Sequence, residues 1–349
     1  MSRPVDRVAL ARLPTPLERL DRLTDSWGGP QLWVKRDDLT GFGLSGNKVR
    51  KLEFHLGAAT AAGADTVVTC GAAQSNHCRA TALACARIGL RTVLVLRTHD
   101  GMPPQRPEGN HLLSVLAGAE TRFVTPEEYE QSDEVMADIA AEVEAAGGRA
   151  WVVPEGGSDA LGMWGFVSAM EELAGQLERL TGAAVIWHAA SSGGTTAGLG
   201  WAADRLGLGH RIVGSSVGDA VPDLRLRIDR IWDDAAARYG GRPPMPDLEL
   251  IDDHIGLGYG KATGDELNTQ VEVTRATGLI LDPTYTGKAI HGLRSDVAAG
   301  RFSPDDHVVF WHTGGGFAVF AHADEIVRTT SPAGRAGDSG EPPSMEASP

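Results

Sequence analysis

Short apolar segments rich in β-branched and aromatic residues alternate with longer segments rich in Ala and Leu along most of the chain. The apolar segments, which we expect to be strands, cover residues 32–35, 66–70, 92–96, 121–124, 150–153, 184–189, 211–217, 248–251, 279–281 and 307–312. Apolar strands that are separated by helical segments are typical of parallel sheets covered by helices. The pattern therefore predicts an α/β fold.

The number of expected strands indicates two sheets. Nine of them follow residue 47, more than one nucleotide-binding-sized sheet holds, so we expect two open, twisted, mostly parallel sheets flanked by helices. We assign residues 48–161 to a small α/β domain, and residues 1–47 and 162–330 to a large domain. Residues 331–349 are rich in Pro, Gly, Ser and Glu, and we predict that they form a disordered tail.

The excess of acidic over basic residues restricts the kinds of molecule that the protein is expected to bind. The formal net charge is -14, and the basic residues are scattered, which argues against a nucleic-acid or anionic-membrane surface. The first residues lack a secretion signal, and no apolar run is long enough to cross a bilayer. We therefore expect a cytoplasmic protein whose partners are small molecules.

The three cysteines carry no sign of chemistry. Cys70, Cys78 and Cys85 lack the spacing of metal ligands, and the chain has no disulfide scaffold. Cys78 and Cys85 lie seven residues apart on one expected helix, which favours a packed face. We predict reduced core thiols and no metal site.

A lysine stands where a polar turn becomes a helix. The turn Ser-Gly-Asn at residues 45–47 leads into Lys48, and the chain has only four other lysines, namely Lys35, Lys51, Lys261 and Lys288. The field at a helix start, together with partial burial, favours the neutral amine that a Schiff base with an aldehyde cofactor requires. The same turn suits an ordinary helix cap and a surface lysine. We expect Lys51 to point to solvent.

Two loops after expected strands are suited to anions, because ligands bind at the carboxyl ends of parallel strands. The loop with Gln74, Ser75, Asn76 and His77 offers either a helix cap or free amides for a substrate carboxylate. The loop at residues 191–199 brings backbone amides and hydroxyls to a helix start, as in a phosphate cup. It lacks the P-loop lysine and the Gly-x-Gly-x-x-Gly spacing, which argues against ATP and NAD. The alternative is a flexible glycine-rich turn.

Two further loops carry hydroxyl groups. Tyr285 lies beside Pro283 and Gly287 at a strand-to-helix junction, where a phenol can serve proton transfer or be an ordinary half-buried tyrosine. Tyr259 lies in a separate glycine-rich loop. Thr313 ends the last expected strand, where its hydroxyl can bind a heteroaromatic nitrogen or cap the next helix.

Together these segments resemble the pyridoxal-phosphate enzymes of the tryptophan-synthase-β fold type, known as fold type II. The closest resemblance is to the group of D-cysteine desulfhydrase and 1-aminocyclopropane-1-carboxylate deaminase. It runs from residue 13 to residue 321 and rests on five motifs in this order: Gly-Asn-Lys-x-Arg-Lys-Leu-Glu, Gln-Ser-Asn-His, Ser-Gly-Gly-Thr, Asp-Pro-x-Tyr-x-Gly-Lys and His-Thr-Gly-Gly.

The resemblance implies roles for individual residues. Lys48 is the Schiff-base lysine, and Tyr285 and Tyr259 are the active-site phenols. The cofactor phosphate binds at Ser192, Gly193, Gly194, Thr195 and Thr196, and the pyridine nitrogen at Thr313, next to Thr286. Ser75 and Asn76 receive the substrate carboxylate, with Gln74 and His77 beside them. The resemblance also implies a homodimer.

One position separates the members of the group. The deaminase has a glutamate after the active-site tyrosine, where this chain has Thr286. A carboxylate there strengthens the electron sink that ring opening needs, whereas β-elimination succeeds with a weaker one. Thr286 and His77 match the desulfhydrase pattern, so we expect D-cysteine to be converted to pyruvate, ammonia and hydrogen sulfide, with Lys48 or Ser75 removing the Cα proton.

Other readings stay open. The chain departs from the usual pattern at Ser191, Thr196, Cys78 and Gly316, so 1-aminocyclopropane-1-carboxylate deamination and an L-cysteate sulfo-lyase activity are the enzymatic alternatives. A non-catalytic pyridoxal-phosphate carrier or regulator is the alternative outside enzymes. The substrate-side residues Ser75, Asn76, Tyr259 and Tyr285 argue against it, because a carrier does not need them.

Overall fold

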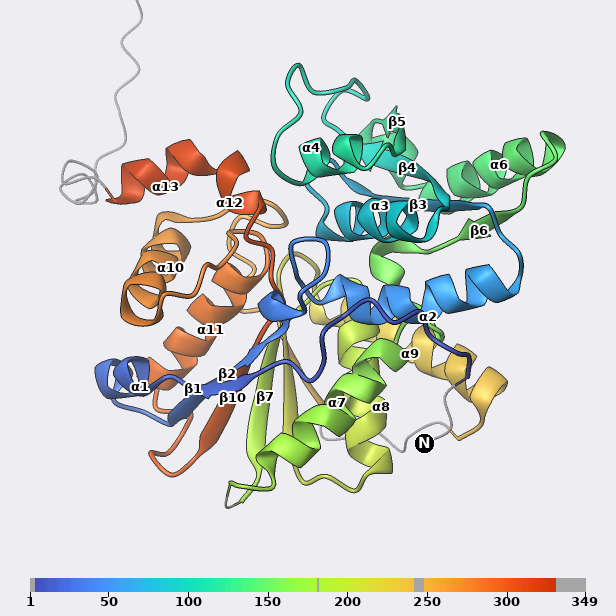
Figure 1. The fold of residues 1–349 in the computed structure, drawn as a ribbon. Coiled ribbons are helices and arrows are strands. Elements are labelled where there is room, and N and C mark those ends of the chain that lie inside the picture. The colour runs from blue at the N-terminus through green and yellow to red at the C-terminus, as the bar shows by residue number, and fades with distance from the viewer. Residues whose placement is uncertain (1–3, 181, 242–247, 331–349) are drawn as a thin grey trace, which may run out of the picture.

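The computed structural model describes residues 4–180, 182–241 and 248–330 and arranges them around two β-sheets (Figure 1). The larger sheet has the strand order β1-β2-β10-β7-β8-β9, and only the β1-β2 pair is antiparallel. Its strands are β1 (Leu17–Arg19), β2 (Gln31–Arg36), β7 (Ala184–Ala190), β8 (Arg211–Ser216), β9 (Leu248–Ile251) and β10 (His307–His312). The second strand of the chain therefore lies directly beside the last.

The smaller sheet is parallel throughout, in the order β5-β4-β3-β6. Its strands are β3 (Thr66–Ala72), β4 (Arg91–Arg97), β5 (Glu120–Val124) and β6 (Ala150–Val152). All four come from one continuous stretch between the two parts of the chain that build the larger sheet. The expectation of two mostly parallel sheets is confirmed, while the domain boundaries near residues 48 and 161 stay a prediction.

Helices flank both sheets (Figure 1). They are α1 (Asp21–Trp27), α2 (Lys48–Ala61), α3 (Asn76–Ile88), α4 (Gly109–Leu116), α5 (Pro126–Tyr129), α6 (Ser132–Ala145), α7 (Trp164–Leu177), α8 (Gly194–Arg205), α9 (Val221–Tyr239), α10 (Gly264–Thr277), α11 (Thr286–Ala298), α12 (Ala318–Ala321) and α13 (Ala323–Thr330). Two short 3-10 helices, η1 (Asp37–Leu39) and η2 (Glu155–Gly157), follow β2 and β6. None of the helices in the described ranges is both long enough and apolar enough to cross a membrane.

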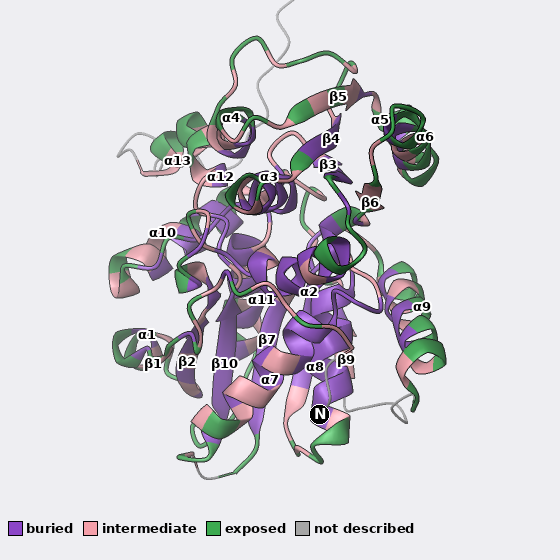
Figure 2. Cartoon of the chain, turned by 45° about the vertical axis from the view of Figure 1, so that its right-hand side comes forward, coloured by how far each residue is buried: buried purple, intermediate pink, exposed green. Residues whose placement is uncertain are grey.

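The central strands are apolar on both faces because both faces are covered. In β7, Ile186 packs into one core cluster, and its neighbours Val185 and Trp187 pack into another. Side chains alternate across a strand, so one continuous apolar run supplies the cores on both sides of the sheet. Figure 2 shows the result as buried central strands inside helices with exposed outer faces.

Helix α2 lies between the two sheets and is buried around most of its circumference. Leu52 and Leu56 pack in a cluster with Val67 of the smaller sheet, while Phe54 packs in the cluster of α7 and α8. Helix α7 approaches α2 so closely that a Cβ on Gly165 would lie 2.4 Å from the Arg50 carbonyl oxygen. The first turn of α2 is therefore held rigidly between both halves of the molecule.

One expected strand is wrong. Residues 279–281 form no strand, although Leu279 and Leu281 are buried as predicted. Side chains of α10 satisfy their backbone groups: Thr274 donates to the Leu279 carbonyl oxygen over 2.8 Å, and Gln270 donates to that of Leu281. The segment therefore has no need of a neighbouring strand. The predicted disordered tail, residues 331–349, lies outside the described residues.

Candidate functional site

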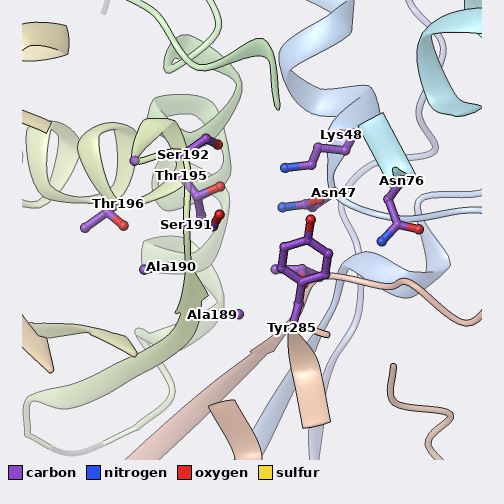
Figure 3. A pocket seen from close by; sticks show the side chains of 12 residues that line it. Asn47, Lys48, Asn76, Ala189, Ala190, Ser191, Ser192, Thr195, Thr196 and Tyr285 are labelled. Carbon is purple, nitrogen blue, oxygen red and sulfur yellow. The ribbon is translucent and has the colours of Figure 1, made fainter. Parts of the chain in front are cut away.

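Loops from both sheets meet at one cavity (Figure 3). Lys48 and Asn47 point from the start of α2 toward the loop after β7, and the Tyr285 hydroxyl points toward both of them. Eleven predicted site residues line this cavity: Lys48, Ser75, Asn76, His77, Ser192, Gly193, Thr195, Thr196, Tyr259, Tyr285 and Thr313. Asn47, Ser191 and Glu155 also line it, although no site role was predicted for them.

The turn before Lys48 is strained and tightly held. Leu44 and Ser45 adopt positive φ angles of 64° and 71°, which non-glycine residues rarely do. Arg79 donates to the Ser45 carbonyl oxygen over 2.8 Å, and the Asn47 backbone amide donates to the Thr313 carbonyl oxygen over 3.0 Å. The turn is thus fixed from the α3 side and from the end of β10, which sets the direction of the Lys48 side chain.

A buried ion cluster holds the other side of the same helical turn. Arg50 donates two hydrogen bonds of 2.8 Å to the two carboxylate oxygens of Asp37, and two of 3.1 Å to Glu172 of α7. Lys35 of β2 pairs with the same Glu172 carboxylate. Arg50 and Asp37 are almost completely buried. This cluster ties α2 to β2 and α7, two residues away from Lys48.

The loop after β7, where we predict a phosphate cup, leads into the start of α8. Gly193 has a φ of 87°, and α8 begins at Gly194 with no capping side chain. A Cβ on Gly194 would lie 2.7 Å from the Ser158 hydroxyl and 2.9 Å from the Lys51 amine. Glycine is therefore required here for the close approach, and the first-turn amides of α8 are left free of intrahelical partners.

The expectation that Lys51 points to solvent is wrong. Its side chain is buried, and its amine donates to the Ser158 hydroxyl over 2.8 Å and to the Gly156 carbonyl oxygen over 3.2 Å. Residues three apart on a helix are neighbours on one face, so Lys51 follows Lys48 toward the cavity. The three-residue spacing from Lys48 could have indicated this orientation. However, the groups that bury the Lys51 side chain belong to η2 and the residue after it, which are distant in sequence.

Two amines, that of the partly buried Lys48 in the cavity and that of the buried Lys51 behind the cup, indicate an anionic ligand. Among the described residues, no carboxylate lies within ion-pair distance of Lys48 or Lys51, and Lys51 lies against the cup. Burial, followed by the charge of Lys48, holds the pKa of Lys51 well below its usual value. A bound anion would favour its charged form. The free amides of α8, the hydroxyls of Ser192 and Thr195, and this amine together fit a phosphate group.

The two predicted phenols are in contact. The hydroxyls of Tyr259 and Tyr285 share a hydrogen bond, and both rings line the cavity. Burial raises the pKa of Tyr259 to about 12 and that of Tyr285 well above its usual value. Both phenols are therefore neutral at physiological pH, and one of them donates to the other in this hydrogen bond, so a proton that Tyr285 gives away can be replaced from Tyr259.

Thr286 and Gln74 do not line the cavity. The Thr286 hydroxyl donates to Asp282 over 2.7 Å, and both Asp282 carboxylate oxygens are occupied by donors from the turn that precedes α11. Gln74 instead accepts a hydrogen bond from the Asn110 backbone amide at the start of α4. Thr286 thus orders the turn that carries Tyr285, and the cavity-facing roles of both residues stay predictions.

The start of α3 presents polar groups to the cavity. Ser75 caps the helix by accepting from the Cys78 backbone amide over 3.2 Å. The Asn76 side-chain oxygen Oδ1 accepts from the side-chain amide of Asn110 over 3.0 Å. His77 is buried beside the Thr69 hydroxyl, and burial holds the pKa of His77 well below its usual value. A neutral histidine and a capped helix start are compatible with a carboxylate in front of them. The cysteines, as predicted, are buried free thiols.

Residues 8–314 match the family model described as "Pyridoxal-phosphate dependent enzyme". A putative 1-aminocyclopropane-1-carboxylate deaminase of Thermotoga maritima is 40% identical over 323 residues, which cover 92% of this chain and 100% of that protein. The chain belongs to the pyridoxal-phosphate dependent enzyme family. Its cofactor is pyridoxal phosphate, as predicted, and the cup and the two amines described above fit that cofactor.

Two further relatives place the chain within this family. A D-cysteine desulfhydrase of Salmonella schwarzengrund is 36% identical over 322 residues, covering 92% of this chain and 97% of that protein. The crystal structure of an ACC deaminase homologue superposes with a TM-score of 0.85 at 35% identity, covering 93% of this chain and 97% of the other. The predicted group, fold type and class, a pyridoxal-phosphate dependent lyase, are confirmed.

A more distant solved structure shows how far the fold extends. A threonine deaminase of Solanum lycopersicum has a TM-score of 0.65 at 18% identity, covering 92% of this chain and 84% of the other. At that identity the likeness concerns the fold alone. This two-sheet arrangement is thus shared with a protein of low sequence identity.

The charge state of Lys48 gives a pH prediction for cofactor capture. Burial lowers the pKa of Lys48 from 10.5 to about 8, although the charge of Glu155 opposes the shift. Because the neutral amine is the nucleophile, we expect apoenzyme to capture added pyridoxal phosphate faster as the pH rises toward about 8. Above that pH the rate should level off. Stopped-flow absorbance measures this rate, and a rise that continues unchanged to pH values near 10 would show an ordinary, exposed lysine.

Proposed function

We propose that the protein catalyses β-elimination from a small β-substituted amino acid, with D-cysteine as the first candidate. D-cysteine and one water would give pyruvate, ammonia and hydrogen sulfide. The Cα–H and Cβ–S bonds break in this reaction, and water replaces nitrogen at Cα. When bound, pyridoxal phosphate withdraws electrons from Cα and so makes loss of the proton feasible. The desulfhydrase relatives support this reaction class.

The proposed binding roles follow the geometry of the cavity. Lys48 would hold the cofactor through its aldehyde, and Thr313 would face the pyridine nitrogen. The phosphate would lie in the cup that is formed by residues 192–196, with the Lys51 amine against it. Ser75 and Asn76 would receive the substrate carboxylate at the start of α3.

Two groups would move protons. The Lys48 amine would remove the Cα proton, because its pKa, lowered to about 8, gives a far larger neutral fraction near physiological pH than an ordinary lysine has. Ser75 stays the alternative base, since its hydroxyl lines the same cavity. Tyr285 would donate a proton to the departing sulfur, and its hydrogen bond with Tyr259 allows that proton to be replaced.

In the described part of the chain, no carboxylate lines the cavity on the side of Thr313, and this observation favours elimination over ring opening. Asp282 is the nearby acid, but its oxygens are occupied by the turn before α11, and it does not line the cavity among the described residues. Nothing there would keep a pyridine nitrogen protonated. Ring opening of 1-aminocyclopropane-1-carboxylate is therefore the second candidate, supported by the name of the Thermotoga relative.

A substrate panel tests this choice. Holoenzyme would be supplied with D- and L-cysteine, L-cysteate, both enantiomers of β-chloroalanine, and 1-aminocyclopropane-1-carboxylate, and keto-acid formation would be measured. We expect D-cysteine and β-chloro-D-alanine to give pyruvate and the cyclopropane to give little product. Turnover of the cyclopropane alone would contradict the proposal. Bound cofactor without turnover of any β-substituted alanine would favour the carrier alternative.

Two expectations belong with this function. A homodimer and a cytoplasmic location both suit an enzyme of small amino-acid metabolism, and both stay predictions. Size-exclusion chromatography with light scattering would give the mass of the assembly, with a monomer of 36.8 kDa as the outcome that rejects the dimer.

A further inference from the structure

Glu155 is the only carboxylate that lines the cavity among the described residues. It begins η2 directly after β6, and it shares its part of the cavity with Ser75, Tyr259 and Tyr285. Glu155 takes no part in the binding and proton-transfer roles of the proposed function. The cavity must accept an amino acid, which carries a carboxylate of its own. A second carboxylate in the cavity wall would repel that group, so its presence needs an explanation.

The position of this carboxylate is fixed by a hydrogen bond. The Tyr129 hydroxyl donates to Glu155 Oε1 over 2.8 Å, and Tyr129 is buried in α5. The Arg97 guanidinium lies 4.9 Å from the centre of the Tyr129 ring and 5.9 Å from that of Tyr259. In the described part of the chain, Glu155 forms no ion pair, and its second carboxylate oxygen accepts no hydrogen bond. One oxygen of this carboxylate is therefore free to face a ligand in the cavity.

The rest of the lining determines which part of a substrate meets this charge. In the proposed function the substrate amine replaces the Lys48 amine, and the carboxylate binds at the start of α3. The wall that remains for the β-substituent is the one with Glu155 and the two tyrosines. The field of Glu155 reaches this centre, because it opposes the lowering of the pKa of Lys48.

We propose that Glu155 selects substrates by the charge of the β-substituent, excluding anionic groups such as sulfonate or carboxylate and admitting neutral or cationic ones. This inference rests on the proposed function and narrows its substrate class. A thiol, a chloride or an amide meets no repulsion, and a donor can bind the free carboxylate oxygen. A like charge a few ångströms away in a partly hydrated cavity weakens binding by about ten-fold. The L-cysteate alternative becomes the least favoured member of the panel.

Equilibrium binding of a matched pair of amino acids tests the proposal. Asparagine and aspartate have the same shape and differ in charge, and neither has a good β-leaving group. Their dissociation constants would be measured for each enantiomer from the change in visible absorbance of the holoenzyme. We expect asparagine to bind about ten-fold more tightly than aspartate.

The Glu155→Gln variant removes the charge and keeps an oxygen that can accept from Tyr129. We expect its aspartate affinity to rise until the two dissociation constants agree within about three-fold. Glu127→Gln is the matched control, since Glu127 is an exposed residue of the neighbouring α5 that does not line the cavity. This control should keep the wild-type preference.

The outcomes separate the two hypotheses. If wild type binds aspartate and asparagine equally, or if Glu155→Gln keeps the full preference, selection by Glu155 is wrong even though neutral β-substituted alanines are turned over. If neither amino acid binds and no β-substituted alanine yields pyruvate, the proposed function itself fails. A loss of preference in Glu127→Gln as well would assign the effect to overall charge and also reject the role of Glu155.

Discussion

Replacing Lys48 with alanine should abolish the visible absorbance of the lysine-bound cofactor and reduce turnover by roughly 10³-fold or more. The Lys48 amine has two proposed roles, holding the cofactor and removing the Cα proton. A positioned proton-transfer group alone raises the reaction rate by roughly 10²- to 10⁴-fold. Absorbance spectra of the purified variant after incubation with pyridoxal phosphate, followed by pyruvate assays, measure both effects.

Lys261→Ala is the matched control for this substitution. Lys261 is exposed on the loop before α10, and it does not line the cavity. Its replacement should leave spectrum and turnover within about two-fold of wild type. A normal cofactor spectrum in Lys48→Ala would mean that a different lysine, foremost Lys51, forms the covalent link.

Replacing Arg50 with methionine should destabilise the apoenzyme by about 3–5 kcal/mol. The buried Asp37 carboxylate would lose its bidentate partner, and Glu172 would lose one of its two cationic partners and keep Lys35. Removing one member of a buried ion cluster leaves an uncompensated charge in the interior, which costs more than the lost contact. Urea unfolding, followed by circular dichroism, measures the free energy of unfolding or, if the transition has several steps, the midpoint of each.

Arg122→Met provides the comparison for Arg50→Met. Arg122 is an exposed residue whose pairs with Glu120 and Glu142 lie at the surface, and such pairs contribute about 0–1 kcal/mol. If both variants lose the same small amount of stability, the Arg50 cluster does not hold α2 in place. If Arg50→Met is less stable than Arg122→Met but captures pyridoxal phosphate at the wild-type rate, the cluster stabilises the fold without positioning Lys48.

Most of the fold was predictable because the signal is local. Strands that lie between two cores are apolar at successive positions, as Val185, Ile186 and Trp187 show, and such runs stand out in a sequence. The failure at residues 279–281 has the same origin. Leu279 and Leu281 are buried like strand residues, but side chains of α10, rather than a neighbouring strand, bind their backbone.

The candidate site was predictable only where its residues belong to recurring motifs. Lys48, Ser75, Tyr285 and the cup stood out for this reason. The burial of Lys51 depends on η2, about a hundred residues away, and the orientation of Gln74 depends on α4. Contacts between segments so far apart leave no local pattern.

The role of Glu155 was hidden for a related reason. Its place in the cavity follows from the packing of η2 against the cup and from the hydroxyl of Tyr129. The charge in a cavity depends on all of its walls together, and these come from α2, α3, β7, α8, η2 and the loops that carry Tyr259 and Tyr285. A sequence pattern predicts one segment of the chain, and it does not show which segments come together around a cavity.

Borohydride reduction of the holoenzyme, followed by proteolysis and mass spectrometry, tests the central claim most directly. Reduction makes the link between lysine and cofactor permanent, and five lysines in the chain are candidates. The account predicts that the pyridoxyl group is found on Lys48 and that Lys51, three residues away, is unmodified. A modified Lys51 with a free Lys48 would contradict the account.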